Sequence, residues 1–126
     1  MRVFMTKSFR RFQRKERIAD AALCEAVRRA ERGLVDADLG HGLIKQRVAR
    51  LGEGRRGGFR TVIAYRVGDR AVFLFGFAKS NQANLSRDDE RDLKDYGALL
   101  LALDAGGIRK MLAGQELTEV HYGEQT

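Results

Sequence analysis

Residues 43–79 of this 126-residue chain read LIKQRVARLGEGRRGGFRTVIAYRVGDRAVFLFGFAK, and this stretch decides the fold. It contains three runs of aliphatic, β-branched and aromatic residues, at 43–50, 59–66 and 71–78, and such residues favour strands. Glycine separates the runs, and residues 67–70 (VGDR) have the composition of a tight turn. We therefore predict an antiparallel β-meander whose last strand, almost continuously apolar, is buried on both faces.

Most of the positive charge of the chain lies in this predicted sheet. Residues 43–79 carry nine Lys and Arg against two acidic residues, and their net charge of +7 equals that of the whole chain. Lys45 and Arg47 stand two positions apart, so both side chains leave the same face of an extended strand. A basic sheet surface in a chain with a sequence pI of about 10.1 favours a polyanionic partner, such as a nucleic acid, over a merely soluble surface.

The connection between the first two runs is rich in glycine. Residues 52–58 read GEGRRGG, and ordering so many glycines is costly in conformational entropy. Arg55 and Arg56 offer contacts to phosphate that would order this segment on binding. The composition is compatible with a flexible element that faces a nucleic acid and equally with an ordinary mobile hairpin.

The overall composition is that of one cytoplasmic domain covering residues 1–126. Hydrophobic residues make up 44% of the chain, which is enough for a core without a metal or a disulfide. The single cysteine, Cys24, excludes an intrachain disulfide and fits a reducing compartment. No apolar run approaches the about 18 residues that a membrane span requires. The two histidines show no repeated ligand spacing, so we expect neither a metal site nor a cofactor.

The chain ahead of the meander predicts a strand and two helices. Residues 2–5 are a short apolar run, and Thr6 is expected to cap a helix that follows it. Asp20 is expected to cap a second helix over residues 21–32. Residues 34–42 then form a polar loop that leads into the meander.

Behind the meander we predict a helix that is capped by Ser86, with acidic residues in its first turn, where the helix dipole favours negative charge. A stripe of apolar residues at helical spacing runs from Leu93 through Tyr96 to Leu103. We expect this stripe to pack on one face of the sheet. The glycine pair at 106–107 is expected to end the helix.

Three segments follow one another in the order and spacing of a known family: KQRVAR at 45–50, GRRGGFRT at 54–61 and RAVFLFGFAKSN at 70–81. In these segments the chain resembles the RelE/ParE superfamily of bacterial type II toxins, in particular its HigB-type branch. The resemblance implies a small α+β fold, with a basic antiparallel sheet packed against N-terminal helices and a C-terminal helix. It also implies a toxin that cuts messenger RNA, usually on the ribosome. A cognate antitoxin, a small DNA-binding protein encoded alongside, would block it.

The resemblance also assigns site residues. Carried over position by position, it implies catalytic cations at Lys45, Arg47, Arg60 and Lys79. We expect the RNA to be contacted by further cations and one aromatic ring of the same stretch, namely Arg50, Arg55, Arg56 and Phe59.

The chemistry open to these cations follows from the requirements of RNA cleavage without a metal. The ribose 2′-OH is the nucleophile, so a base must take its proton, cations must stabilise the phosphorane, and an acid must protonate the leaving oxygen. Lys45 is the candidate base, because crowding by neighbouring cations favours its neutral form. Arg47 and Arg60 would hold the non-bridging oxygens with their forked donors, and Lys79 is the candidate acid.

Two positions depart from the family pattern, and two other functions stay open. An arginine often follows the last lysine and a tyrosine comes several residues later, but here these positions are Ser80 and Ser86. One alternative is a ParE-like toxin that inhibits a topoisomerase and cuts nothing; the other is an RNA-binding module without cleavage. Fold does not decide between them. Cations gathered on a single face favour a metal-independent endoribonuclease.

Overall fold

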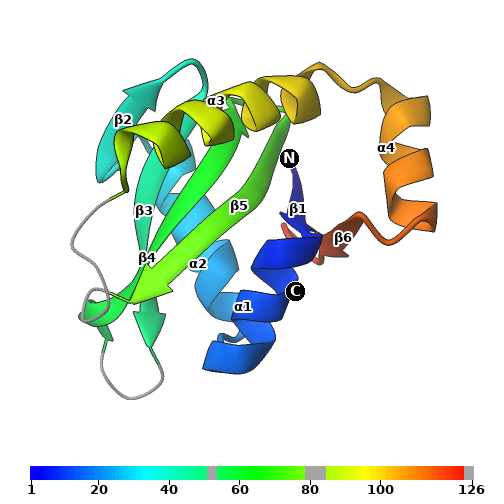
Figure 1. Ribbon diagram of the computed structural model, residues 1–126. Helices are drawn as coiled ribbons and strands as arrows, with labels where there is room; N and C mark the ends of the chain where they lie inside the picture. Colours follow the sequence, from blue (N-terminus) through cyan, green and yellow to red (C-terminus); the bar gives the residue numbers. More distant parts are fainter. Residues whose placement is uncertain (51–53, 79–84, 124–126) are drawn as a thin grey trace.

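One mixed β-sheet with helices on both faces organises the computed structural model of the protein (Figure 1). The structure describes residues 1–50, 54–78 and 85–123, and residues 54–56 by their backbone alone. The elements in chain order are β1 (Arg2–Thr6), α1 (Lys7–Glu16), α2 (Asp20–Glu31), β2 (Ala37–Gly40), β3 (Leu43–Arg50), β4 (Gly54–Arg66), β5 (Arg70–Ala78), α3 (Arg87–Ala102), α4 (Ala105–Ala113) and β6 (Leu117–Val120). The strands lie in the order β2-β3-β4-β5-β1-β6.

The central strands are the predicted meander. β3 pairs antiparallel with β4, and β4 pairs antiparallel with β5. The sheet continues beyond the meander, because β1 pairs parallel with β5 and β6 pairs antiparallel with β1. The sheet is therefore mixed, where a purely antiparallel sheet was expected. The predicted α+β class, with a small RelE-like arrangement of helices around the meander, is confirmed.

Different helices cover the two faces of the sheet (Figure 1). On the α1–α2 face, Phe9 packs against Phe73 with ring centroids 5.1 Å apart. On the α3 face, Leu100 belongs to a second buried cluster together with Val72. Burying each such side chain contributes roughly 1.5–3 kcal/mol. Residues 71–74 of β5 are buried throughout, so the central strand is covered on both faces as predicted.

Ahead of the meander, one cap prediction is confirmed and two predictions are wrong. The Thr6 hydroxyl caps α1 by accepting a hydrogen bond from the Phe9 amide at 3.2 Å. Asp20 does not cap α2, because its carboxylate accepts a hydrogen bond from Gln13 Nε2 at 2.6 Å. The predicted loop at 34–42 contains the edge strand β2, whose four residues are too few to show strand periodicity.

The glycine-rich connection has different bounds from those predicted at 52–58. β4 already begins at Gly54, and the first two positions of the predicted loop lie outside the described residues. A Cβ at Gly58 would meet the Val48 carbonyl oxygen at 2.0 Å. Glycine is required there by the close approach of two strand backbones, next to a register shift between Val48 and Arg50.

Behind the meander, Ser86 caps α3 as predicted, because its hydroxyl accepts from the amide three residues on at 3.0 Å. The prediction that the glycine pair at 106–107 ends this helix is wrong, because α3 already ends at Ala102 and the pair lies in a new helix, α4. The Asp104 carboxylate caps α4 by accepting a hydrogen bond from the Gly107 amide at 2.7 Å. The prediction that Tyr96 packs on the sheet as part of the apolar stripe is wrong, because Tyr96 is 39% exposed. Gly97 is buried against the sheet in its place, which allows the helix backbone to approach closely.

Candidate nucleic-acid interface

Arg47 on β3 and Arg60 on β4 are direct partners across the two strands, so their side chains leave the same face of the sheet. Lys45 lies two residues before Arg47 and therefore shares that face. The face is the α3 side, because Gln46, between the two cations, points towards α2. We call Lys45, Arg47 and Arg60 the cationic cluster.

Arg60 has an unmet hydrogen-bonding requirement. Its Nη1 is shielded from solvent and has no hydrogen-bond partner in the described part of the chain. Arg60 lies opposite Phe77 of β5, which is 4% exposed. A buried donor without an acceptor costs roughly 1–3 kcal/mol. A phosphate oxygen would supply the acceptor, and the low local dielectric beside an apolar ring would strengthen that bond.

A buried polar network holds the backbone beneath the cationic cluster. Gln46 is fully buried, and its Nε2 donates to carbonyl oxygens of α2 and of the segment after it, at 2.9 and 3.2 Å. The Arg47 amide donates to the Asp36 carboxylate at 2.6 Å, and the Arg47 carbonyl accepts from the Arg29 guanidinium. These bonds join β3 to α2, so Lys45 and Arg47 project from a well-supported strand.

Sequence reasoning missed Arg29, Asp36 and Gln46 as supporting residues. Arg29 is only 7% exposed and forms ion pairs with Glu25 at 2.9 Å and with Asp36 at 3.5 Å. The sequence offered one hint of this network. Gln46 is a polar residue at the inward-facing position between two outward-facing cations. Its partners lie far away in sequence, and no local pattern identifies them.

Arg50 and Phe59 lie on the other side of the sheet from the cationic cluster. Phe59 is fully buried on the α1–α2 face, where it packs edge-on against Phe12 with centroids 5.4 Å apart. The Arg50 guanidinium lies over the Phe59 ring at 5.1 Å and 3.9 Å from the Glu16 carboxylate. In this structure Phe59 is a core residue, and its ring offers no surface on which a base stacks.

The remaining predicted site residues are only partly placed. Arg55 and Arg56 belong to the first part of β4, where the structure describes the backbone and not the side chains. Lys79 and Ser80 lie outside the described residues, immediately after β5. Ser86, at the position where related toxins often have tyrosine, has a structural role as the cap of α3.

Other candidate groups are accounted for by packing. Cys24 is 5% exposed, burial raises the pKa of its thiol, and its Sγ lies 3.3 Å from the His121 carbonyl oxygen.

Among residues 1–50, 54–78 and 85–123, no group of three or more His, Cys, Asp or Glu could hold a metal ion. In the same ranges, no helix is long and apolar enough to cross a membrane.

The fold and the cationic cluster define a small α+β protein whose mixed sheet presents a lysine and two arginines on one face. Residues 1–120 match the family model of the RelE toxin of the RelE/RelB toxin–antitoxin system. The chain therefore belongs to the RelE toxin family, whose members generally inhibit translation and have a cognate antitoxin as partner. A comparison with curated proteins gives no match.

Proposed function

We propose that this toxin is a metal-independent endoribonuclease of the HigB-type branch, which cleaves messenger RNA on the ribosome and thereby stops translation and growth. The observation that carries the proposal is the cationic cluster. Arg47 stands directly opposite Arg60, and Arg60 Nη1 lacks an acceptor within the described residues. The backbone of an RNA supplies anionic oxygens, and one of them would be the acceptor that Arg60 Nη1 lacks.

The proposed reaction transfers the phosphoryl group within the RNA. The ribose 2′-oxygen loses its proton to a base and attacks the adjacent phosphorus, and the bond from phosphorus to the 5′-oxygen breaks. That 5′-oxygen gains a proton, so the products are a 2′,3′-cyclic phosphate and a free 5′-hydroxyl. The protein exchanges only protons with the RNA, and the rest of its contribution is positioning and charge stabilisation.

Each cation has one role in this scheme. Arg47 and Arg60 begin from Cα atoms roughly 5 Å apart, the spacing of directly paired residues, so two guanidinium forks reach one phosphate and hold its non-bridging oxygens. Lys45 acts as the general base that takes the 2′-OH proton. Lys79 donates the proton to the leaving oxygen, a role that rests on the family resemblance. Arg55 and Arg56 contact phosphates farther along the RNA.

Two other functions remain as alternatives. A ParE-like inhibitor of a topoisomerase acts through protein contacts and does not need several cations side by side on one face of its sheet. The cationic cluster therefore favours the nuclease. A plain RNA-binding module would use the same cluster for affinity only. Cleavage of ribosome-bound messenger RNA would take place in the cytoplasm, where the antitoxin, a small DNA-binding protein encoded alongside, neutralises the toxin.

Induced expression in a bacterium, followed by mapping of transcript 5′ ends, separates these functions. The nuclease predicts growth arrest together with new 5′-hydroxyl ends inside coding regions. Purified transcript with and without translating ribosomes then shows whether cleavage needs the ribosome. Growth arrest with intact transcripts would support the ParE-like function, and RNA binding without new ends would support the binding module.

A further inference from the structure

Two phenylalanines of β5 lie on the same face of the sheet as the cationic cluster. Phe77 is the direct partner of Arg60. Phe75 stands two positions earlier, in the row of the sheet that contains Val62 and Lys45. Neighbouring strands lie roughly 5 Å apart, so each ring begins within about 10 Å of a cation of the cluster. A nucleotide that places its phosphate on these cations therefore has its base within reach of the rings.

A β-bulge turns these two rings towards the cations. Consecutive residues of β4 pair with Phe73 and Phe75, so Leu74 is an extra residue in β5. Side chains of a regular strand alternate, and without the extra residue Phe75 would point towards α1, as Phe73 does. Gly76 takes that position instead, where a Cβ would lie 2.4 Å from the Phe12 ring. Bulges beside functional sites re-aim side chains in this way.

Phe75 and Phe77 form an aromatic pair whose members differ in exposure. Their ring centroids lie 6.0 Å apart with an interplanar angle of 43°. Phe77 is only 4% exposed, whereas Phe75 is partly exposed at the margin of the hydrophobic cluster beneath α3. Phe75 therefore retains ring surface for a ligand, and Phe77 supports it from the side.

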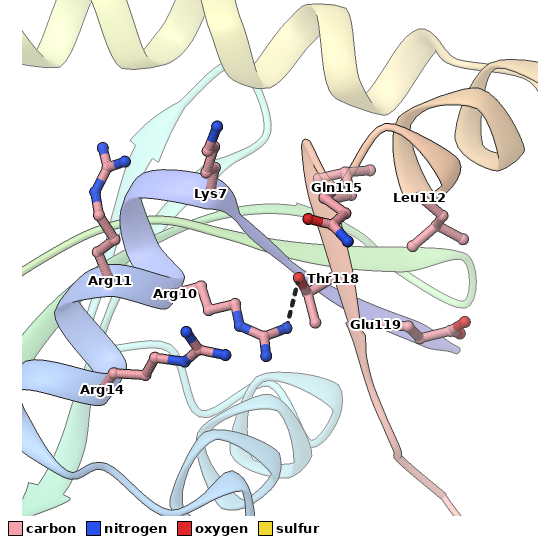
Figure 2. A pocket seen from close by; sticks show the side chains of 9 residues that line it. Lys7, Arg10, Arg11, Arg14, Leu112, Gln115, Thr118 and Glu119 are labelled. Atoms are coloured by element: carbon pink, nitrogen blue, oxygen red, sulfur yellow. Dashed lines mark hydrogen bonds between the residues drawn. The ribbon is translucent and has the colours of Figure 1, made fainter.

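A second basic surface of the protein has no such ring. Figure 2 shows a groove between α1 and β6 that is lined by four cations of α1, namely Lys7, Arg10, Arg11 and Arg14. Of the described residues that line this groove, none is aromatic. Its cations can hold phosphates, but a base finds no stacking surface there. This contrast makes the face of the cationic cluster the better place for a nucleotide with its base.

We propose that Phe75 stacks on the base of the nucleotide whose phosphate is held by Arg47 and Arg60. The inference rests on the proposed function, because it takes the RNA to lie on the cationic cluster. Stacking on an aromatic ring tolerates every base and is strongest for large ring systems, so the site favours a purine without reading a sequence. A base held in this way also restricts the attached ribose, which helps to align the 2′-oxygen with its phosphorus. Phe75 thus takes the role that the sequence predicted for Phe59.

The test compares two hexanucleotides with 2′-O-methyl groups, which the protein cannot cleave. One carries adenine at its third position and no other base, and the second has no base at all. We expect the purified full chain to bind the first about tenfold more tightly in calorimetry, as one stacked base should provide. In the complex, the ring current of Phe75 should shift the adenine H8 resonance upfield.

Variants of one residue separate stacking from general packing. Phe75→Leu keeps an apolar side chain but removes the ring, so it should abolish both the tenfold preference and the H8 shift. Phe75→Tyr should restore both. Phe12→Leu is the matched control, because Phe12 is a partly exposed phenylalanine on the opposite face. That control and Arg10→Ala in the α1 groove should both keep the preference for the base.

Circular dichroism checks that each variant is folded, and Phe75→Met takes the place of Phe75→Leu if the latter is not. The proposal is overturned if the parental protein binds both hexanucleotides equally or binds neither. It is also overturned if the variant without the ring keeps the preference. Mapping of transcript 5′ ends tests the proposed function separately. Base preference without new ends would overturn the nuclease alone, and new ends without base preference would overturn the stacking role alone.

Discussion

Arg47 and Arg60 face each other directly across β3 and β4, a pairing of like charges that is normally avoided in sheets. One of the two, Arg60, also has a buried Nη1 without a hydrogen-bond partner in the described part of the chain. Both features lower the stability of the free protein, and both are relieved by an anion that is bound by the two arginine side chains. Local features that lower the stability of the free protein and are relieved by a ligand are characteristic of functional sites.

Removing the Arg60 charge should therefore stabilise the free protein. We expect Arg60→Met to raise the free energy of unfolding by about 1 kcal/mol, since it removes an unpaired donor and a like-charge contact. Arg70→Met is the matched control, because the Arg70 side chain is 13% exposed and its Nη1 donates to the Leu100 carbonyl oxygen at 3.0 Å. That control should lose about 1–2 kcal/mol. Urea unfolding measures both, and an equal loss in the two variants would show that Arg60 is satisfied in the free protein.

The catalytic roles predict loss of cleavage without loss of fold. Lys45→Ala should slow the chemical step about 10²- to 10⁴-fold, as expected for loss of a general base. Arg60→Ala should slow it about 10²- to 10³-fold through lost charge stabilisation. Single-turnover cleavage at saturating RNA or ribosomes is the measurement, because saturation hides binding defects.

The control for these cleavage assays is Arg66→Ala. Arg66 is an exposed arginine at the other end of β4, where it forms a 3.0 Å ion pair with Asp69. It should cut at close to the parental rate. Parental rates for Lys45→Ala and Arg60→Ala as well would place the site elsewhere and favour the ParE-like function.

The buried network beneath the cationic cluster should be important for stability. We expect Gln46→Leu to lower the free energy of unfolding by about 2–4 kcal/mol, because it leaves two carbonyl oxygens without their donor and the Asp36 amide without its 2.8 Å acceptor. Gln13→Leu is the comparison, since Gln13 makes an exposed hydrogen bond to Asp20 and should cost less than about 1 kcal/mol. Similar losses in thermal unfolding of the two variants would argue against a supporting role for Gln46.

Two glycines predict opposite effects of the same substitution. A Cβ at Gly76 would lie 2.4 Å from the Phe12 ring, so Gly76→Ala should force the ring away from the core and cost about 1–3 kcal/mol. At Gly106, within α4, the nearest atom would be 3.5 Å away, and Gly106→Ala should stabilise the helix by about 0.5 kcal/mol. Melting temperatures that move in the same direction would contradict this account of the packing.

A tyrosine near the C-terminus predicts sensitivity to alkaline pH. Burial, together with the hydrogen bond that its hydroxyl donates to the Glu31 carboxylate, raises the pKa of Tyr122 well above its usual value. The folded state holds this proton more tightly than the unfolded state, so the stabilisation is complete below about pH 10 and is lost as the pH rises further. Tyr122→Phe should flatten the fall in stability between about pH 9 and about pH 11. Tyr96→Phe should flatten this fall in stability less. Tyr96 is 39% exposed, and its pKa is raised through burial without the hydrogen bond to Glu31 that Tyr122 makes.

Features that depend on neighbouring residues could be predicted from the sequence. Thr6 and Ser86 cap their helices because each hydroxyl reaches an amide three residues away. Lys45 and Arg47 share a face because strand side chains alternate with a period of two. The same local reasoning was wrong for Asp20, whose carboxylate found a partner in the preceding helix.

Features that depend on distant partners were decided by the tertiary structure. The pairing of Arg47 with Arg60 requires one register of β3 on β4, and a shift after Val48 brings Arg50 over the Phe59 ring on the other face. Likewise, β6 lies beside β1 in the sheet, although more than one hundred residues of the chain separate the two strands. Register and strand order are set by which surfaces bury together, and the sequence pattern of any one segment does not contain that information.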